Sequence, residues 1–246
     1  MKALAALWKL ARGFVHALAG WATIVFIFPR LAPAQRQARV QAWARRMLAV
    51  LGVTLELRGQ PPQEGPLLLV ANHISWLDIL VMHAARHCRF VSKSDIRRWP
   101  IIGTLASGAD TLYIERESRR DAMRVVHQMA DGLRAGHILA VFPEGTTSDG
   151  RTLLPFHANL LQAAVSAQAP VQPVALQFME ADSGRISLAP CYIGDDSLLV
   201  SLWRTLTGGP IVAVVRYGEP QSARGRDRRR WAADLRDEVT RLRETP

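Results

Sequence analysis

The sequence predicts an α/β fold, with a largely parallel or mixed sheet flanked by helices and a membrane-associated helical segment at the N-terminus. Short apolar runs typical of buried strands alternate along the chain with amphipathic segments typical of helices. Several of these runs stop at polar residues, which is where open α/β sheets carry their sites. The N-terminal segment differs from both, because residues 1–55 carry eight basic residues and no acidic one.

The length of 246 residues suits one domain with a substantial core. We divide the chain into N-terminal membrane-anchoring helices at 1–50 and an α/β domain at 51–246. The net charge of +10 lies mainly at the two ends, since residues 216–246 hold nine arginines against six acidic residues. This pattern favours an anionic membrane surface over nucleic acid, for which no binding motif accompanies the charge. Cys88 and Cys191 are interpreted as free core thiols of a reducing compartment.

The N-terminal segment contains an apolar run at 13–28, slightly shorter than the roughly 20 residues that span a bilayer. Basic residues flank the run on both sides, so their distribution predicts no orientation. Residues 36–50 predict a second, amphipathic helix, and Trp8, Trp21 and Trp43 would suit the depth of a membrane interface. We interpret the segment as a monotopic anchor. A single span and a helical hairpin that only packs on the core are the alternatives.

From residue 53 onward, strand and helix patterns alternate. We expect strands at 53–58, 66–71, 89–92, 111–114, 137–142, 171–178, 186–189 and 211–217. We expect helices at 75–86, 119–135, 159–169, 198–206 and 228–243. The short apolar stretch at 101–107 is either a helix or a membrane-facing patch.

The strand at 66–71 leads directly into polar residues of catalytic type. Asn72 and His73 follow it, and Ser75 with Asp78 three residues later has the pattern of a helix start. Asp78 could then accept a hydrogen bond from one ring nitrogen of His73 and leave the other nitrogen to take a proton from a hydroxyl group. The alternative is that Asp78 only caps the helix and His73 is an ordinary loop residue.

Three further blocks follow this motif, at 108–116, 141–148 and 171–176. Together the chain has Asn-His-x4-Asp, then hydrophobic-x-x-Arg, then Phe-Pro-Glu-Gly-Thr, then a strand rich in Val and Pro. This order resembles the glycerolipid acyltransferase family, which includes the 1-acyl-sn-glycerol-3-phosphate acyltransferases. The likeness covers residues 72–176, and the first and third blocks are its specific parts.

The resemblance implies an enzyme that moves a fatty acyl group from an acyl thioester to the hydroxyl of a lysolipid, with 51–246 as the acyltransferase domain. His73 would be the general base and Asp78 its orienting partner. Arg116 would hold an anionic group of the acceptor, and Lys93, at the end of a strand, could assist. A surface ion pair is the alternative for Arg116.

The third block would line the acceptor site. Gly145 would let the backbone approach the substrate, Glu144 would accept a hydrogen bond from a hydroxyl, and Thr146 would complete the lining. For Glu144, a structural bond to the loop at 72–73 is the alternative. Because the sequence has no Gly-x-Ser-x-Gly elbow, we expect direct attack by the acceptor without an acyl-enzyme. We expect neither a metal nor an organic cofactor.

Two departures from the family pattern concern the acceptor. Thr147 and His157 stand where many lysophosphatidate acyltransferases have Arg and Lys. The third block also looks like the branch that acylates lyso-ornithine lipid, an acceptor with a carboxylate and an amine. We place 1-acyl-sn-glycerol-3-phosphate first and lyso-ornithine lipid second. The expected donor is acyl-CoA or acyl carrier protein.

A function of another class is a catalytically silent, membrane-bound lipid-binding protein. The presence of the residues expected for catalysis argues against it. From the resemblance and the N-terminal segment, we expect the cytoplasmic face of the inner membrane, with a peripheral, monotopic or single-span attachment.

Overall fold

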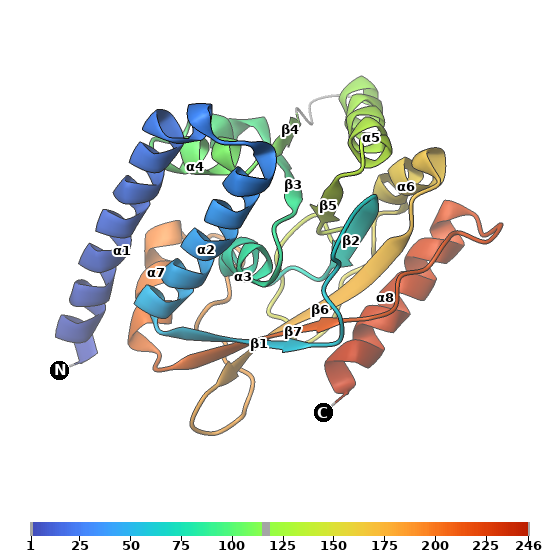
Figure 1. Cartoon of the computed structure of the whole chain (residues 1–246). Coiled ribbons are helices and arrows are strands. Elements are labelled where there is room, and N and C mark those ends of the chain that lie inside the picture. Colours follow the sequence, from blue (N-terminus) through green and yellow to red (C-terminus); the bar gives the residue numbers. More distant parts are fainter. Residues whose placement is uncertain (1, 115–118, 246) are drawn as a thin grey trace.

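One seven-stranded sheet organises the part of the chain that this computed structural model describes, residues 2–114 and 119–245 (Figure 1). The strand order is β1-β7-β6-β2-β5-β3-β4, and every neighbouring pair is parallel except β6–β7. The strands are β1 Val53–Arg58, β2 Leu67–Ala71, β3 Arg89–Lys93, β4 Leu112–Ile114, β5 Ile138–Val141, β6 Val171–Glu180 and β7 Ile211–Tyr217. The predicted α/β fold with a mostly parallel, mixed sheet is confirmed.

Helices cover both faces of this sheet. They are α1 Lys2–Phe26, α2 Pro33–Leu51, α3 Leu77–Ala85, α4 Ile102–Gly108, α5 Arg119–Arg134, α6 Leu161–Ala167, α7 Leu198–Thr207 and α8 Arg228–Glu244, with short 3₁₀ turns η1 Phe28–Arg30, η2 Ser94–Arg98 and η3 Ala158–Leu160. The apolar cluster on one face draws on α1, α2, α3 and α7, and the cluster on the other face draws on α5, α6 and α8. The fold therefore has three layers.

The central strand β2 explains how both faces are filled. Leu67, Leu69 and Ala71 belong to the cluster under α2 and α3, whereas Leu68 and Val70 belong to the cluster under α5 and α8. Successive side chains of a strand point to opposite faces, so a continuous apolar run suits a strand buried on both sides. This burial fixes the position at which β2 ends and its loop begins.

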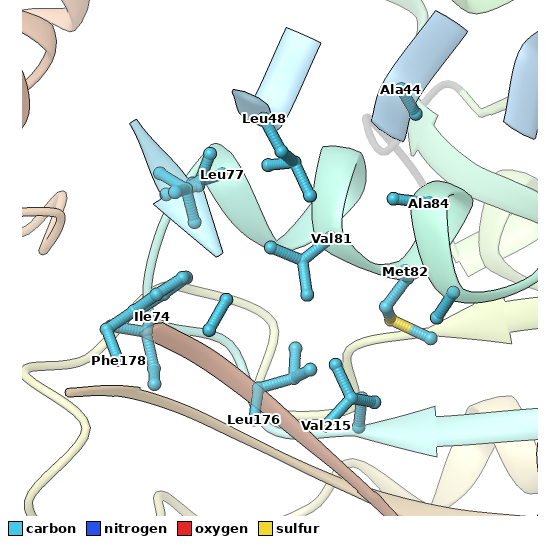
Figure 2. Close-up of a cluster of buried hydrophobic side chains, with 14 of the residues drawn as sticks. Ala44, Leu48, Ile74, Leu77, Val81, Met82, Ala84, Leu176, Phe178 and Val215 are labelled. Carbon is cyan, nitrogen blue, oxygen red and sulfur yellow. The ribbon is translucent and has the colours of Figure 1, made fainter. Parts of the chain in front are cut away.

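Helix α3 is enclosed between α2 and the sheet. Figure 2 shows Leu48 of α2 above Leu77 and Val81 of α3, with Leu176 and Val215 of the sheet on the other side. All of these side chains are almost completely buried. Asp78 lies on the first turn of α3, so its position is held by this packing.

Helices α1 and α2 form an N-terminal hairpin that packs on the rest of the chain (Figure 1). Gly20 meets Trp43 so closely that a Cβ at residue 20 would lie 2.5 Å from the indole nitrogen. Trp43 also stacks on His16 and donates to the His16 carbonyl at 3.1 Å. The expectation that Trp43 faces a membrane interface is therefore wrong, because its ring fills the contact between α1 and α2. Trp8 and Trp21, by contrast, are exposed.

The outer side of α1 is apolar and exposed, with Leu4, Leu7, Trp8, Phe14, Val15, Leu18, Trp21, Val25 and Phe26 accessible to solvent. None of the described helices is both long and apolar enough to cross a membrane.

Two local predictions differ from the structure. Residues 186–189 form no strand, since only Ile186 makes an isolated bridge, to Met179 of β6. The helix expected from residue 75 begins at Leu77. Ser75 is instead drawn into the loop, where its hydroxyl donates to the carbonyl of Pro190. The region at 101–107, which had two readings, is the helix α4.

Candidate active site

The candidate site lies where two neighbouring parallel strands end. Strands β2 and β5 pair in parallel with Val70 opposite Val141, so the residues that follow them emerge at the same edge of the sheet. His73 comes two residues after β2, and Glu144 comes three residues after β5. The sheet topology thus brings together two motifs that are distant in the sequence.

His73 and Asp78 form a hydrogen-bonded pair, with Nδ1 of His73 2.7 Å from Oδ2 of Asp78. The same carboxylate oxygen accepts the backbone N–H groups of Ile74, at 2.7 Å, and Ser75, at 2.9 Å. Asp78 is completely buried, while the side chain of His73 keeps 20% of its accessible surface. Because a carboxylate can only accept, Nδ1 carries the proton and Nε2 is left as the basic nitrogen.

The imidazole of His73 is held from a second side by an aromatic ring. It stacks on Phe142, with ring centroids 4.0 Å apart and an angle of 5° between the planes. Phe142 in turn stacks on Phe90 of β3. The plane of the imidazole is therefore fixed by packing as well as by Asp78.

The residue before His73 is anchored to the next strand. The side-chain amide of Asn72 donates to the carbonyl of Leu176 at 3.0 Å, and its oxygen accepts the Leu176 N–H at 2.7 Å. Asn72 is fully buried. Its two bonds replace ladder hydrogen bonds at the point where β2 ends, and so fix where the His73 loop begins.

Glu144 ties the two strand-end loops together. Its Oε1 accepts the backbone N–H of His73 at 2.7 Å, and its Oε2 accepts the N–H of Leu154 at 2.9 Å. Burial raises the pKa of Glu144 above its usual value, and the two N–H donors oppose that rise. The structural interaction considered for Glu144 is therefore present. Each oxygen can accept a further bond, so the contact with an acceptor hydroxyl stays a prediction.

The other residues expected in the site are less buried. Gly145 has a φ of 74°, and a Cβ there would lie 3.0 Å from a ring carbon of His157, so a side chain would be both strained and crowded. Thr146 is exposed, and Lys93 is exposed at the end of β3. Arg116 lies outside the described residues. Their expected contacts with substrate stay predictions.

Arginines of α8 contribute to the site, and the sequence interpretation did not include them. Arg236 donates to the carbonyls of Leu153, at 2.9 Å, and Leu154, at 3.2 Å. Arg243 donates to the carbonyls of Gly150 and Arg151. Both therefore hold the loop whose Leu154 N–H reaches Glu144. The basic character of the last helix was the available signal, but charge alone did not indicate what it contacts.

The two positions that depart from the family pattern lie beside this loop. The Thr147 hydroxyl donates to the carbonyl of Tyr192, and the N–H of Tyr192 donates to the carbonyl of Ile74 at 3.1 Å. The N–H of His157 donates to the carbonyl of Pro143 at 2.8 Å. Both residues thus border the loops that carry His73 and Glu144.

Neither cysteine is placed as a nucleophile. Cys88 is completely buried, and burial raises the pKa of its thiol far above the usual value. Cys191 is also buried, and burial raises its pKa to about 11. A thiol that stays protonated is a poor nucleophile. The described residues contain no cluster of three or more His, Cys, Asp or Glu side chains that could hold a metal ion.

A strand-end histidine oriented by a buried carboxylate defines an acid–base site on an α/β scaffold. The fold is similar to that of the 1-acyl-sn-glycerophosphate acyltransferase of Thermotoga maritima, with a TM-score of 0.65, 18% identity, and coverage of 97% of this chain and 99% of that one. The model of the family described as Acyltransferase matches residues 53–177.

Two relatives extend this likeness beyond the matched domain. A lyso-ornithine lipid O-acyltransferase of Pseudomonas aeruginosa is 38% identical over 83% of this chain and 78% of its own length. A 1-acyl-sn-glycerol-3-phosphate acyltransferase of Neisseria gonorrhoeae is 38% identical over 71% of this chain and 68% of its own. The chain belongs to the acyltransferase family, and it is an acyltransferase.

Proposed function

We propose that this enzyme transfers a fatty acyl group from an acyl thioester to the hydroxyl of a lysolipid. The observation that carries the proposal is the 2.7 Å bond between His73 and Asp78. It leaves Nε2 of His73 without a hydrogen bond among the described residues, on a side chain that is partly exposed. A free, oriented ring nitrogen is what a general base needs.

In this mechanism the acceptor hydroxyl gives its proton to Nε2 of His73 as its oxygen attacks the thioester carbonyl carbon. The tetrahedral intermediate then collapses, the C–S bond breaks, and the thiolate takes the proton from His73. The new ester and the free thiol are the products. Asp78 stabilises the imidazolium that forms between the two proton transfers. The high pKa of both cysteine thiols supports direct transfer without an acyl-enzyme.

We propose 1-acyl-sn-glycerol-3-phosphate as the acceptor and lyso-ornithine lipid as the second candidate. Relatives of similar identity carry each name. The first acceptor is supported because acylation of 1-acyl-sn-glycerol-3-phosphate is the commoner activity in the family. The second is supported by Thr147, which contributes no charge where many lysophosphatidate acyltransferases have Arg, and whose hydroxyl is engaged by Tyr192. The proposed donor is acyl-CoA or acyl carrier protein.

We further propose that residues 1–50 attach the acyltransferase domain, 51–246, to the cytoplasmic face of the inner membrane. The apolar outer side of α1 and the +8 charge of residues 1–55 support a monotopic attachment. A lysolipid stays in the bilayer while its hydroxyl reacts, so the enzyme must work at the membrane surface.

The test is an assay of the purified protein with a labelled acyl thioester and a panel of lysolipids that includes both acceptors. Acylation of lysophosphatidate above lyso-ornithine lipid is the expected result. Thr147→Arg should then raise the use of lysophosphatidate relative to lyso-ornithine lipid. Failure of the wild-type protein to acylate any lysolipid would contradict the proposal, and no change on Thr147→Arg would remove Thr147 from the account of the acceptor.

A further inference from the structure

The turn between α1 and α2 lies beside α4 (Figure 1). Residues of this turn and of α4 line a pocket that is separate from the candidate active site. Its volume is about 430 Å³, within the range of ligand clefts, about 300 to 1,000 Å³. One wall comes from the turn between α1 and α2, with Phe28 and Pro29, and the other from α4. Neither His73, Asp78 nor Glu144 lines it.

Two arginines line this pocket, and both have guanidinium N–H donors that are not used within the described part of the chain. Arg36 of α2 uses its Nε to bond the carbonyl of Leu31 at 3.0 Å, and its other two nitrogens bond nothing among the described residues. The guanidinium of Arg97, in η2, lies over the ring of Tyr113 at 5.8 Å and makes no hydrogen bond in the described part of the chain. Paired arginine forks are suited to phosphate oxygens.

The third charged group in the pocket is Asp110, which leaves the lining with one net positive charge. A carboxylate among the lining residues is unfavourable for a bare phosphate. It becomes favourable when the ligand combines an anionic phosphodiester with a hydroxyl donor, because Asp110 can accept from that donor. Two arginines and one aspartate in the lining therefore favour a ligand that combines a phosphodiester with several hydroxyl groups.

Exposed apolar residues neighbour, along the chain, the residues of both pocket walls. Phe26 and Ile27, 60% and 40% exposed, directly precede its residues Phe28 and Pro29. Trp99, 42% exposed, follows Arg97 by two residues, and Ile102, 39% exposed, directly precedes Gly103 of the lining. We call these four residues the apolar rim. Apolar and aromatic side chains beside cations suit the boundary between acyl chains and phosphates in a bilayer.

We propose that this pocket binds the headgroup of an anionic phospholipid of the bilayer, with phosphatidylglycerol as its ligand. Arg36 and Arg97 hold the phosphodiester, Asp110 accepts from the glycerol hydroxyls, and the apolar rim enters the acyl region. The inference rests on the proposed membrane attachment and adds a specific lipid site to it. Such a site fixes the depth and orientation of the enzyme on the membrane.

The experiment measures co-sedimentation of the protein with vesicles in the absence of donor and acceptor. One set of vesicles contains phosphatidylglycerol, and another contains cholesteryl hemisuccinate at pH 8, an anionic lipid without phosphate; phosphatidylcholine is the host in both. The pocket variant is Arg36→Gln with Arg97→Gln. Its matched control is Arg39→Gln with Arg98→Gln, which removes the same charge at exposed positions outside the pocket.

On phosphatidylglycerol the pocket variant should bind about tenfold more weakly than the control variant, because charged hydrogen bonds are lost as well as charge. On cholesteryl hemisuccinate the two variants should bind equally. Equal binding of both variants to phosphatidylglycerol would overturn the proposal, as would a deficit of the pocket variant on both lipids. Circular dichroism of each variant checks that it is folded.

A second variant keeps both arginines and adds an acid to the pocket wall. Thr104→Glu, on α4, should lower binding to phosphatidylglycerol more than Ala38→Glu, which adds the same charge at an exposed position of α2. Equal effects of these two substitutions would also overturn the proposal. Acyl transfer by the wild-type protein in neutral detergent micelles tests the proposed function separately, because that assay contains no phosphatidylglycerol.

Discussion

Arg236 donates from its Nε to the carbonyl of Leu154 at 3.2 Å, while the N–H of Leu154 donates to Glu144 at 2.9 Å. Glu144 in turn accepts the backbone N–H of His73. The last helix of the chain is thus connected to the proposed base through three residues. Arg236 touches none of the proposed reacting atoms, so it acts as a positioning residue.

Replacing Arg236 should therefore reduce activity through Glu144. Arg236→Met keeps much of the side-chain stem but loses the donors to Leu153 and Leu154, at a cost of about 1.5–3 kcal/mol for bonds from a charged group. Rates of acyl transfer should fall, whereas Arg229→Met, at an exposed position of the same helix, should have little effect.

A double substitution separates this role from a general loss of stability. When Glu144→Gln is already present, Arg236→Met should cause little further loss of rate, because both act on the same connection. Additive losses in the double variant would show that Arg236 acts elsewhere.

Glu144→Gln should weaken the loop that carries His73. An amide has only one acceptor oxygen, so either the N–H of His73 or that of Leu154 loses its partner. The free energy of unfolding should fall by about 1–3 kcal/mol, and acyl transfer should decline with it. Denaturant unfolding and initial rates measure the two effects, and unchanged values of both would contradict the assignment of Glu144 as the link between loops.

Two buried histidines should make stability depend on pH. Burial lowers the pKa of His83 to about 3 and that of His87 to about 4, so in the folded protein both stay neutral at pH values where the unfolded chain takes up protons. The stability they contribute is complete above the usual pKa, 6.5, and is lost as the pH falls towards 4 and 3.

His83→Leu should reduce this dependence by about 1.4 kcal/mol per pH unit between about pH 5.5 and 4.5. Urea unfolding at a series of pH values measures it. His127→Leu, at an exposed position of α5, is the control and should leave the slope as it is. The same slope in His83→Leu and in the wild type would contradict the assignment.

The sequence was sufficient to predict the seven strands of the sheet, though it also predicted an eighth that does not form, and it predicted the pairing of His73 with Asp78. Runs such as 66–71 are apolar throughout because both faces of the sheet are covered, and such runs are recognisable without knowledge of their partners. The motif from His73 to Asp78 is local, so its geometry follows from a strand end joined to a helix start.

Contacts between distant segments could not be predicted in the same way. Arg236 meets Leu154 across 82 residues, and nothing in the helical pattern of α8 identifies that partner. Tryptophan is a residue type common at membrane interfaces, but the ring of Trp43 packs against Gly20 of the neighbouring helix. Residues 186–189 alternate like a strand, yet they make only one isolated bridge, because most of the segment finds no partner strand at the sheet.

The role of Asp78 is tested by Asp78→Asn. An amide oxygen can still accept one hydrogen bond, but it carries no charge to stabilise the imidazolium of His73. Acyl transfer should fall by about 10²-fold or more, with the larger effect on kcat. A rate near that of the wild type would mean that the buried carboxylate only holds the loop through Ile74 and Ser75.

The most direct test of the account is the rate of acyl transfer by His73→Ala, measured with a labelled acyl thioester and the lysolipid that the wild type uses best. The variant should stay folded and bound to vesicles, since the backbone bonds of the loop are kept. We predict that its rate falls by about 10²- to 10⁴-fold or below detection, while His127→Ala keeps the wild-type rate. A folded His73→Ala protein that transfers acyl groups at nearly the wild-type rate would contradict the assignment of His73 as the base.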